Sequence, residues 1–432
     1  MNDEVTKWVR RHRLLRVNKT PDIYEHKKER LLHIFQAAAA NTSAPIQPYI
    51  YESHHADIRQ LPDHNTIICD VHFWDISMLV ASSFYINPVY DIKKLADALI
   101  VDSLLCHGNP QLALKYARQF ISNPHIAAFN ADKHWELITG TVQMQVAFAL
   151  LHEIYHFHDD SSEPAASILR NYLKQHVDNQ NNCATTINSL DLSPLSQYLD
   201  RIEIKSALTW PQPKNAMDIA KKATMELYHV VTTYIDLIHF PDECKDIDEK
   251  QKILLLFYAC DNYIRGRRAI LLPEEEALEE GVCDLLALID LLDFRLSGFS
   301  EKKCRELAIT GYLLCLLTTD MIYGAMNIHQ YSHGDGYQHI DEIYMRREKE
   351  RQLLPLVISL YGLKYNQKIT KKEIKKLIRH ANQVSQICDT MYWEFSDYIF
   401  SQDYTRKEFI PHGSNEWVSL YKEINRLMQF PI

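Results

Sequence analysis

The stretch VAFALLHEIYHFHDD, from Val146 to Asp160, carries the most specific pattern in the chain. His152 and His156 are four residues apart, so on a helix their side chains lie one turn apart on the same face. Imidazoles at this spacing can bind one metal ion, and Glu153 between them can reach a water molecule on that ion. The turns before His152 are apolar and uncharged, which is typical of a buried helix. The alternative is a helix end where the two histidines only pack against neighbouring side chains.

The composition of the whole chain indicates what surrounds this stretch. The 432 residues are 46% hydrophobic, and this fraction excludes a disordered chain. They include 21 histidines and only 11 glycines. Tight turns in sheets and phosphate-binding loops need glycine, whereas helices avoid it. We therefore predict a mainly α fold with a small β-sheet.

The charge of the chain bears on its partners. A net charge of −9 argues against a surface built to bind nucleic acid. Two basic segments, 7–19 and 368–380, have no interleaved aromatic platform, and we interpret them as solvated helix faces. Nucleic acid is therefore not an expected partner.

Local patterns predict where the strands and helices lie. IQPYIYE (46–52) and TIICDVHFWDISMLV (66–80) are rich in β-branched and aromatic residues and predict strands, and HIAAFN (125–130) is a weaker candidate. Helical periodicity predicts a basic amphipathic helix before about Ala40 and further helices along most of the chain. These lie at 111–121, 135–158, 165–176, 215–239, 248–265, 274–296, 301–327, 340–361, 371–400 and 416–428. Polar clusters at 179–189 and 209–215 predict loops.

The cysteines and the apolar segments indicate a cellular compartment. The nine cysteines are scattered and never form CxxC, which predicts free thiols in a reducing cytoplasm and no thiolate zinc ribbon. The first residues are charged and lack the apolar core of a signal peptide. The most apolar segment, Gly311–Met326, is short for a membrane span and contains Asp320. We expect it to be a buried core helix, and we expect no membrane partner.

The HExxH stretch resembles the active helix of the zincin metallopeptidases. In these proteins three side chains bind zinc and a fourth position stays open for water. The metzincin pattern HExxHxxGxxH would require glycine where Asp159 stands and histidine where Ser162 stands, and the chain departs from it at both positions. The gluzincin pattern instead takes its third ligand from a later helix, as a glutamate followed four residues later by an aspartate.

The segment PEEEALEEGVCDLLALIDLLDF contains such a pair in Glu280 and Asp284. By resemblance, Glu280 is the third zinc ligand, and Asp284 accepts a hydrogen bond that fixes the tautomer of a ligand histidine. Glu279 and then His229 are the alternatives for the third ligand. Taken alone, a glutamate and an aspartate at this spacing are more often part of a solvated helix face.

The resemblance is confined to these two short motifs, yet it implies an order of segments along the chain. In layout the chain is similar to bacterial cytosolic HExxH peptidases, including the phage-exclusion (Lit-type) peptidases. The implied fold is a zincin-like catalytic core elaborated by helices. Its segments are a basic helical segment (1–44), a small sheet with the active helix (45–160), a helical insertion (161–272), the third-ligand helix with a substrate-side loop (273–346), and a C-terminal helical region (347–432).

The substrate-side loop is the stretch HQYSHGDGYQHIDEIYMR, from His329 to Arg346. Gluzincins often place groups that bind the reacting carbonyl downstream of the third ligand. Tyr337, His339 or His333 could donate a hydrogen bond to the oxyanion, and Arg346 could bind a substrate carboxylate. An ordinary polar loop between helices is an equally good interpretation.

These observations lead to one main hypothesis and two alternatives. The main one is a zinc-dependent peptidase that cleaves an intracellular protein or peptide, with Glu153 as general base and HIAAFN as the edge strand that binds the substrate. The first alternative is a di-iron carboxylate bundle, because Glu153-x-x-His156 recurs as Glu226-x-x-His229 on another helix. The second is a helical interaction scaffold without catalysis.

Overall fold

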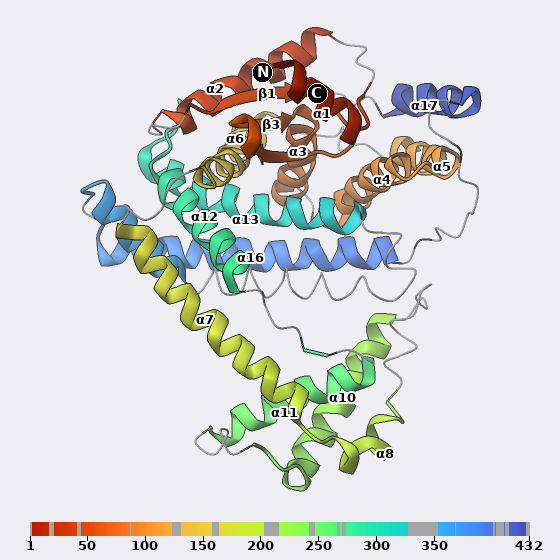
Figure 1. Cartoon of the computed structure of the whole chain (residues 1–432), viewed down its shortest axis with the longest axis vertical. Coiled ribbons are helices and arrows are strands. Elements are labelled where there is room, and N and C mark those ends of the chain that lie inside the picture. Colours follow the sequence, from red (N-terminus) through yellow and green to blue (C-terminus); the bar gives the residue numbers. More distant parts are fainter. Residues whose placement is uncertain are drawn as a thin grey trace. The chain divides into compact units, whose positions relative to one another are not determined.

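In the computed structural model of the 432-residue chain, the described residues fall into fifteen stretches. They are 2–16, 21–40, 45–86, 88–122, 131–157, 164–202, 216–241, 247–265, 268–269, 274–326, 353–367, 369–400, 402, 410 and 414–428. Over these residues the protein is mostly helical and has one small three-stranded sheet (Figure 1). The expectation of a mainly α fold with a small sheet is confirmed.

The elements follow one another along the chain with these bounds. The helices are α1 (Asn2–His12), α2 (Pro21–Ala39), α3 (Val71–Ile86), α4 (Pro88–Cys106), α5 (Pro110–Ser122), α6 (Ala131–Tyr155), α7 (Pro164–Ser189), α8 (Ser196–Leu199), α10 (Ala216–Tyr234), α11 (Glu249–Arg265), α12 (Glu274–Asp293), α13 (Glu301–Met326), α16 (Lys371–Phe400) and α17 (Asn415–Leu427). A further apolar helix spans Leu353–Lys364. The strands are β1 (Gln47–Tyr51), β2 (Ile58–Leu61) and β3 (Thr66–Asp70).

The sheet has the strand order β1-β3-β2. β3 is central and completely buried; it pairs in parallel with β1 and antiparallel with β2. In the register of the antiparallel pair, Gln60 faces Ile67 and Leu61 faces Thr66. β2 is therefore an edge strand of the sheet formed by the described residues, and one side of its backbone is not used by β3.

The predicted strand at 66–80 is only half correct, because the chain turns into helix α3 after Asp70. An uninterrupted apolar run fits a buried strand and a buried helix equally well, so its pattern does not locate the change. The Asp70 carboxylate determines it: Oδ1 accepts a hydrogen bond from the backbone N–H of His72 at 3.0 Å, as a helix cap does. The same carboxylate accepts hydrogen bonds from the backbone N–H groups of Ser53 and Ala56, which fixes the loop before β2.

A second correction concerns α7, which continues to Ser189 through the predicted loop at 179–189. Asn179, Asn182, Thr185 and Asn188 of that segment are exposed to solvent. The apolar side of α7 contains Leu173, Val177 and Ala184, which are 5%, 3% and 6% exposed. Their spacing keeps one face of the helix apolar in spite of the many asparagines.

α6 and α13 pack against each other at the centre of a hydrophobic core, and a glycine allows the two helices to approach closely. A Cβ atom on Gly311 of α13 would lie 2.9 Å from the backbone carbonyl carbon of Met144 on α6. Two stretches, His134–Tyr155 and Glu301–Met326, are long and apolar enough to cross a membrane, but most of each is buried inside the protein. The prediction that Gly311–Met326 is a buried core helix is confirmed by this burial.

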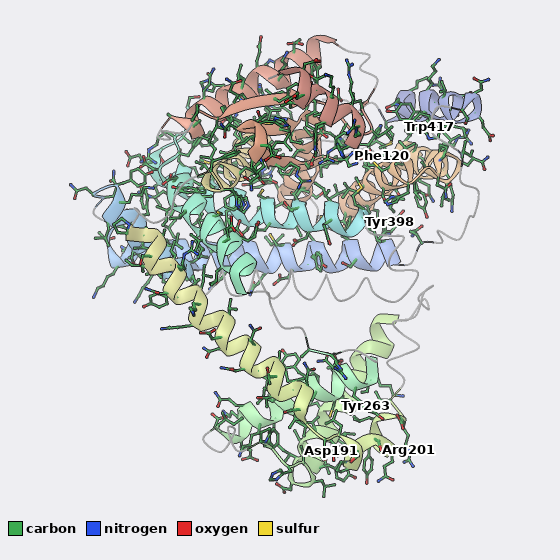
Figure 2. The ribbon with its side chains drawn as sticks, in the orientation of Figure 1. Phe120, Asp191, Arg201, Tyr263, Tyr398 and Trp417 are labelled. Carbon is green, nitrogen blue, oxygen red and sulfur yellow. The ribbon has the colours of Figure 1, made fainter. Side chains whose placement is uncertain are left out.

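α16 lies alongside α13 (Figure 1). Nε2 of His380 on α16 lies 2.9 Å from Oγ1 of Thr310 on α13. Near the other end of α16, the hydroxyl of Tyr398 (Figure 2) donates a hydrogen bond of 2.8 Å to Asp97 on α4. Polar contacts at two places therefore join α16 to α13 and α4.

The chain divides into two compact units. The first comprises 1–167, 283–399 and 404–432, and the second comprises 168–282 with 400–403. The second unit has its own core, in which Leu195, Leu227 and Leu256 are completely buried. The range 161–272, expected to be a helical insertion, falls largely within this second unit.

A cluster of buried charges joins both ends of the described chain to the sheet in the first unit. Asp102 on α4 lies 2.8 Å from Arg16, 2.6 Å from His54 and 2.7 Å from His72. The Tyr421 hydroxyl of α17 donates a hydrogen bond of 2.6 Å to the Leu15 carbonyl. Trp417, labelled in Figure 2, stacks on the Tyr421 ring and covers it.

Candidate metal centre

The HExxH motif lies at the C-terminal end of α6, with His156 in the turn directly after the helix. Phe148, Leu151 and Ile154 are at most 4% exposed, and they anchor this end of the helix in the core. The helix ends at Tyr155, and a hydrogen bond from the Phe157 N–H to the Ile154 carbonyl closes the turn that follows. The apolar residues therefore hold the motif at the end of a rigid helix.

The structure brings the two histidines of the motif and Glu280 of α12 together. One potential ligand atom from each of His152, His156 and Glu280 lies within 4.8 Å of the others. The Nε2 atoms of His152 and His156 are 3.1 Å apart and face each other. All three side chains are partly exposed. The arrangement is that of three ligands around one shared position.

Two neighbouring residues of α12 contact the other nitrogen of each histidine. Nδ1 of His152 lies 2.6 Å from Oδ1 of Asp284, whose side chain is 2% exposed. Nδ1 of His156 lies 3.7 Å from the Cys283 sulfur. Because each Nδ1 is turned toward α12, each Nε2 is the nitrogen available to a metal ion.

Glu153 points toward the sheet. Its Oε2 accepts a hydrogen bond of 2.7 Å from the backbone N–H of Gln60 on the edge strand β2. In antiparallel pairing the N–H and C=O of one residue point to the same side. The side of β2 that β3 does not use therefore faces the end of α6.

A polar cluster holds the end of α6 against α12. The Tyr155 hydroxyl donates a hydrogen bond of 2.6 Å to Asp290 on α12. Lys364 forms a salt bridge with Asp290 at 2.7 Å, and Tyr365 donates to the same carboxylate at 2.8 Å. Tyr155 lies inside the HExxH motif, so these contacts fix the turn that carries His156.

The chemistry of the three side chains fits a zinc ion. Two imidazole nitrogens and one carboxylate oxygen are a ligand set that zinc accepts in catalytic sites, with a fourth position for water. The contact between Asp284 and His152 is the carboxylate–histidine arrangement that typically supports such ligands. The three residues could hold a metal, although this arrangement by itself does not identify the ion.

The alternative ligands lie elsewhere. Glu279 is exposed on α12 and is not part of the group. Glu226 and His229, the second ExxH motif, are exposed on α10. Among the described residues, His152, His156 and Glu280 are the one group of three such side chains close enough to share a metal.

Several predicted features lie outside the described residues. They are the oxyanion candidates Tyr337, His339 and His333, the carboxylate candidate Arg346, and the strand predicted at 125–130. No sequence pattern predicts five further residues of the site: Gln60, Tyr155, Cys283, Asp290 and Lys364. One signal in the sequence points to Cys283. Cys283 and Asp284 follow Glu280 by three and four residues, so all three side chains share a face of α12.

Comparison with known proteins gives no relative for this site. No protein-family model matches the chain, and no curated protein or solved structure matches it either.

Proposed function

We propose that the protein is a zinc-dependent metallopeptidase with a zincin-like catalytic core. The observation that carries the proposal is the convergence of His152, His156 and Glu280 within 4.8 Å, with Asp284 behind His152. An HExxH motif by itself has a real chance of being accidental. The third ligand and the supporting carboxylate come from a helix more than a hundred residues later, which makes an accident a poor explanation.

The residues around this centre have separate tasks in peptide hydrolysis. A zinc ion held by His152, His156 and Glu280 would supply a Lewis acid and would lower the pKa of a bound water to about 7. Glu153 takes the proton from the attacking water and passes it to the leaving nitrogen. Asp284 holds His152 in the tautomer that presents Nε2, and the Tyr155–Asp290 contact keeps the turn of His156 in place.

The edge strand β2 is the best candidate for binding an extended substrate. It lies beside Glu153, and the side of its backbone that faces Glu153 is not paired with β3. A peptide added to this edge would form backbone hydrogen bonds, and such pairing tolerates many sequences. Residues 125–130, for which the sequence predicts this role, lie outside the described residues, so the proposal is made for β2. We propose an intracellular protein or peptide as the substrate, since the eight described cysteines are free thiols.

The test replaces the general base and leaves the ligands in place. Glu153→Gln keeps the size of the side chain but removes its basicity, so we expect unchanged zinc content and loss of cleavage by roughly a hundredfold or more. Zinc is measured by atomic emission, and cleavage by mass spectrometry of new N-termini in a mixed peptide library. Glu136→Gln, an exposed site on the same helix, is the matched control. Full activity of Glu153→Gln would contradict the proposed role.

A further inference from the structure

The two histidines of the candidate centre have outer contacts that differ in length and in the kind of partner atom. His152 Nδ1 lies 2.6 Å from a carboxylate oxygen, whereas His156 Nδ1 lies 3.7 Å from a thiol sulfur. Both contacts come from adjacent residues of α12, Asp284 and Cys283. These two residues are 2% and 1% exposed. Water therefore has little access to the side chains that make these contacts.

The chemistry of a ligand histidine determines what such a contact does. When Nε2 binds a metal, the proton is on Nδ1, and that N–H needs an acceptor to fix the orientation of the ring. A sulfur atom is a weak acceptor with longer hydrogen bonds than oxygen. At 3.7 Å the Cys283 sulfur is within the range of a hydrogen bond to sulfur, and the Nε2 of the same ring faces His152.

We propose that Cys283 is a positioning residue for His156: its sulfur accepts the Nδ1–H hydrogen bond that orients this ring toward the metal. The proposal rests on the proposed zinc site and extends it by a residue at an unspecified position of the ExxxD pattern. Cys283 then orients the ring of His156, as Asp284 orients the ring of His152. One turn of α12 orients both histidines and also carries Glu280, so a single helix sets the whole ligand geometry.

The contact has a consequence that a purely structural thiol would not have. Removing the acceptor takes away the contact of the His156 Nδ1–H with Cys283 on α12, so the orientation of the ring is less restricted. Loss of such an outer partner typically weakens metal binding roughly 10- to 100-fold. A residue that only fills space would change the stability of the fold and leave the zinc affinity as it was.

The experiment measures zinc affinity of the full chain by competition with a chromophoric chelator. Cys283→Val keeps the approximate volume and removes the acceptor, so we expect zinc binding to weaken roughly 10- to 100-fold. Cys283→Ser keeps an acceptor and should recover most of the loss. Cys304→Val, at a fully buried thiol on α13, is the control and should bind zinc as the wild type does. The absorption spectrum of the Co²⁺-loaded protein gives a second readout: it should change in Cys283→Val and stay unchanged in Cys304→Val.

The outcomes separate this proposal from the proposed function. If the wild type binds one zinc and Cys283→Val binds it equally well with an unchanged Co²⁺ spectrum, the role of Cys283 is wrong and the zinc site stands. Equal losses in Cys283→Val and Cys283→Ser, or a similar loss in Cys304→Val, also overturn it. A wild-type protein that binds no zinc would overturn the proposed function and this inference with it.

Discussion

At the scale of single residues, the buried charges near the sheet show how burial and pairing compete. Asp102 is completely buried, which acts to raise its pKa, but Arg16 and His72 hold that pKa well below its ordinary value. Burial raises the pKa of Asp70 to about 7, although the carboxylate accepts several hydrogen bonds. Burial and then Arg13 lower the pKa of His55 to about 4. Each shift links the stability of the protein to pH.

The pH dependence of stability can be tested at His55. Its pKa is about 4 in the folded protein and about 6.5 in an unfolded chain. The stability that neutral His55 contributes is therefore present above pH 6.5 and is lost as the pH falls toward 4, by about 2 to 3 kcal/mol. The raised pKa of Asp70 has the opposite effect: its contribution to stability increases as the pH falls below about 7. The prediction is therefore made for the difference in the free energy of unfolding between the wild type and a variant at His55.

The measurement compares the wild type with His55→Gln by urea unfolding at pH 7, 5.5 and 4. Between pH 7 and 4 the free energy of unfolding of the wild type should fall relative to that of His55→Gln. A difference between the two proteins that is the same at all three pH values would contradict this account of His55.

At the scale of elements, the crossing of α6 and α13 depends on Gly311. Its Cβ position lies 2.9 Å from the Met144 backbone carbon, so an added methyl group forces the two helices apart. Such overpacking costs about 1 to 3 kcal/mol, and the gain in helix propensity offsets only about 1 kcal/mol of it. We expect Gly311→Ala to lower the free energy of unfolding in denaturant melts.

Gly140 on α6 provides the matched control for this crossing. The nearest atom to a Cβ there is the end of the Phe299 ring, at 3.2 Å, which can move. Gly140→Ala should therefore change stability by less than about 1 kcal/mol, because its propensity gain meets little resistance. Equal stabilities of the two variants would show that the α6–α13 crossing tolerates an added methyl group.

How far the sequence predicts these elements depends on what fixes each of them. Helical periodicity predicts the bounds of α11 and α13 to within one residue at each end, because each has a continuous apolar face. It did not find β2, since four residues at the edge of a sheet have no period long enough to recognise. It also missed α4, and it extended the strand beyond Asp70, because a completely apolar run does not distinguish a buried helix from a strand.

The candidate site was partly predictable for a similar reason. His152, Glu153 and His156 follow from local spacing, and Glu280 with Asp284 follows from a family pattern. Gln60, Asp290 and Lys364 contribute through contacts between elements far apart in the sequence, and no local pattern in one chain reports such contacts. Cys283 is an intermediate case: the sequence predicts the face of α12 on which it lies, but not its contact with His156.

At the scale of the whole molecule, the proposed zinc ion would connect segments that are far apart in the chain. His152 and His156 come from the end of α6 and the turn after it, and Glu280 comes from α12, after a compact stretch with its own core. A ligand that binds only the folded state adds RT ln(1 + [L]/Kd) to stability, which is about 4 kcal/mol at a thousand times Kd. Zinc should therefore raise the midpoint of thermal unfolding, and removal by a chelator should lower it.

The most direct measurement is the zinc content and affinity of the purified chain beside two neighbouring variants. Glu280→Gln removes the proposed third ligand, and Glu279→Gln makes the same chemical change at the exposed residue before it. The account predicts one zinc per chain in the wild type and in Glu279→Gln, and affinity at least about tenfold weaker in Glu280→Gln. A wild type without zinc, or a loss of affinity in Glu279→Gln with none in Glu280→Gln, would contradict it.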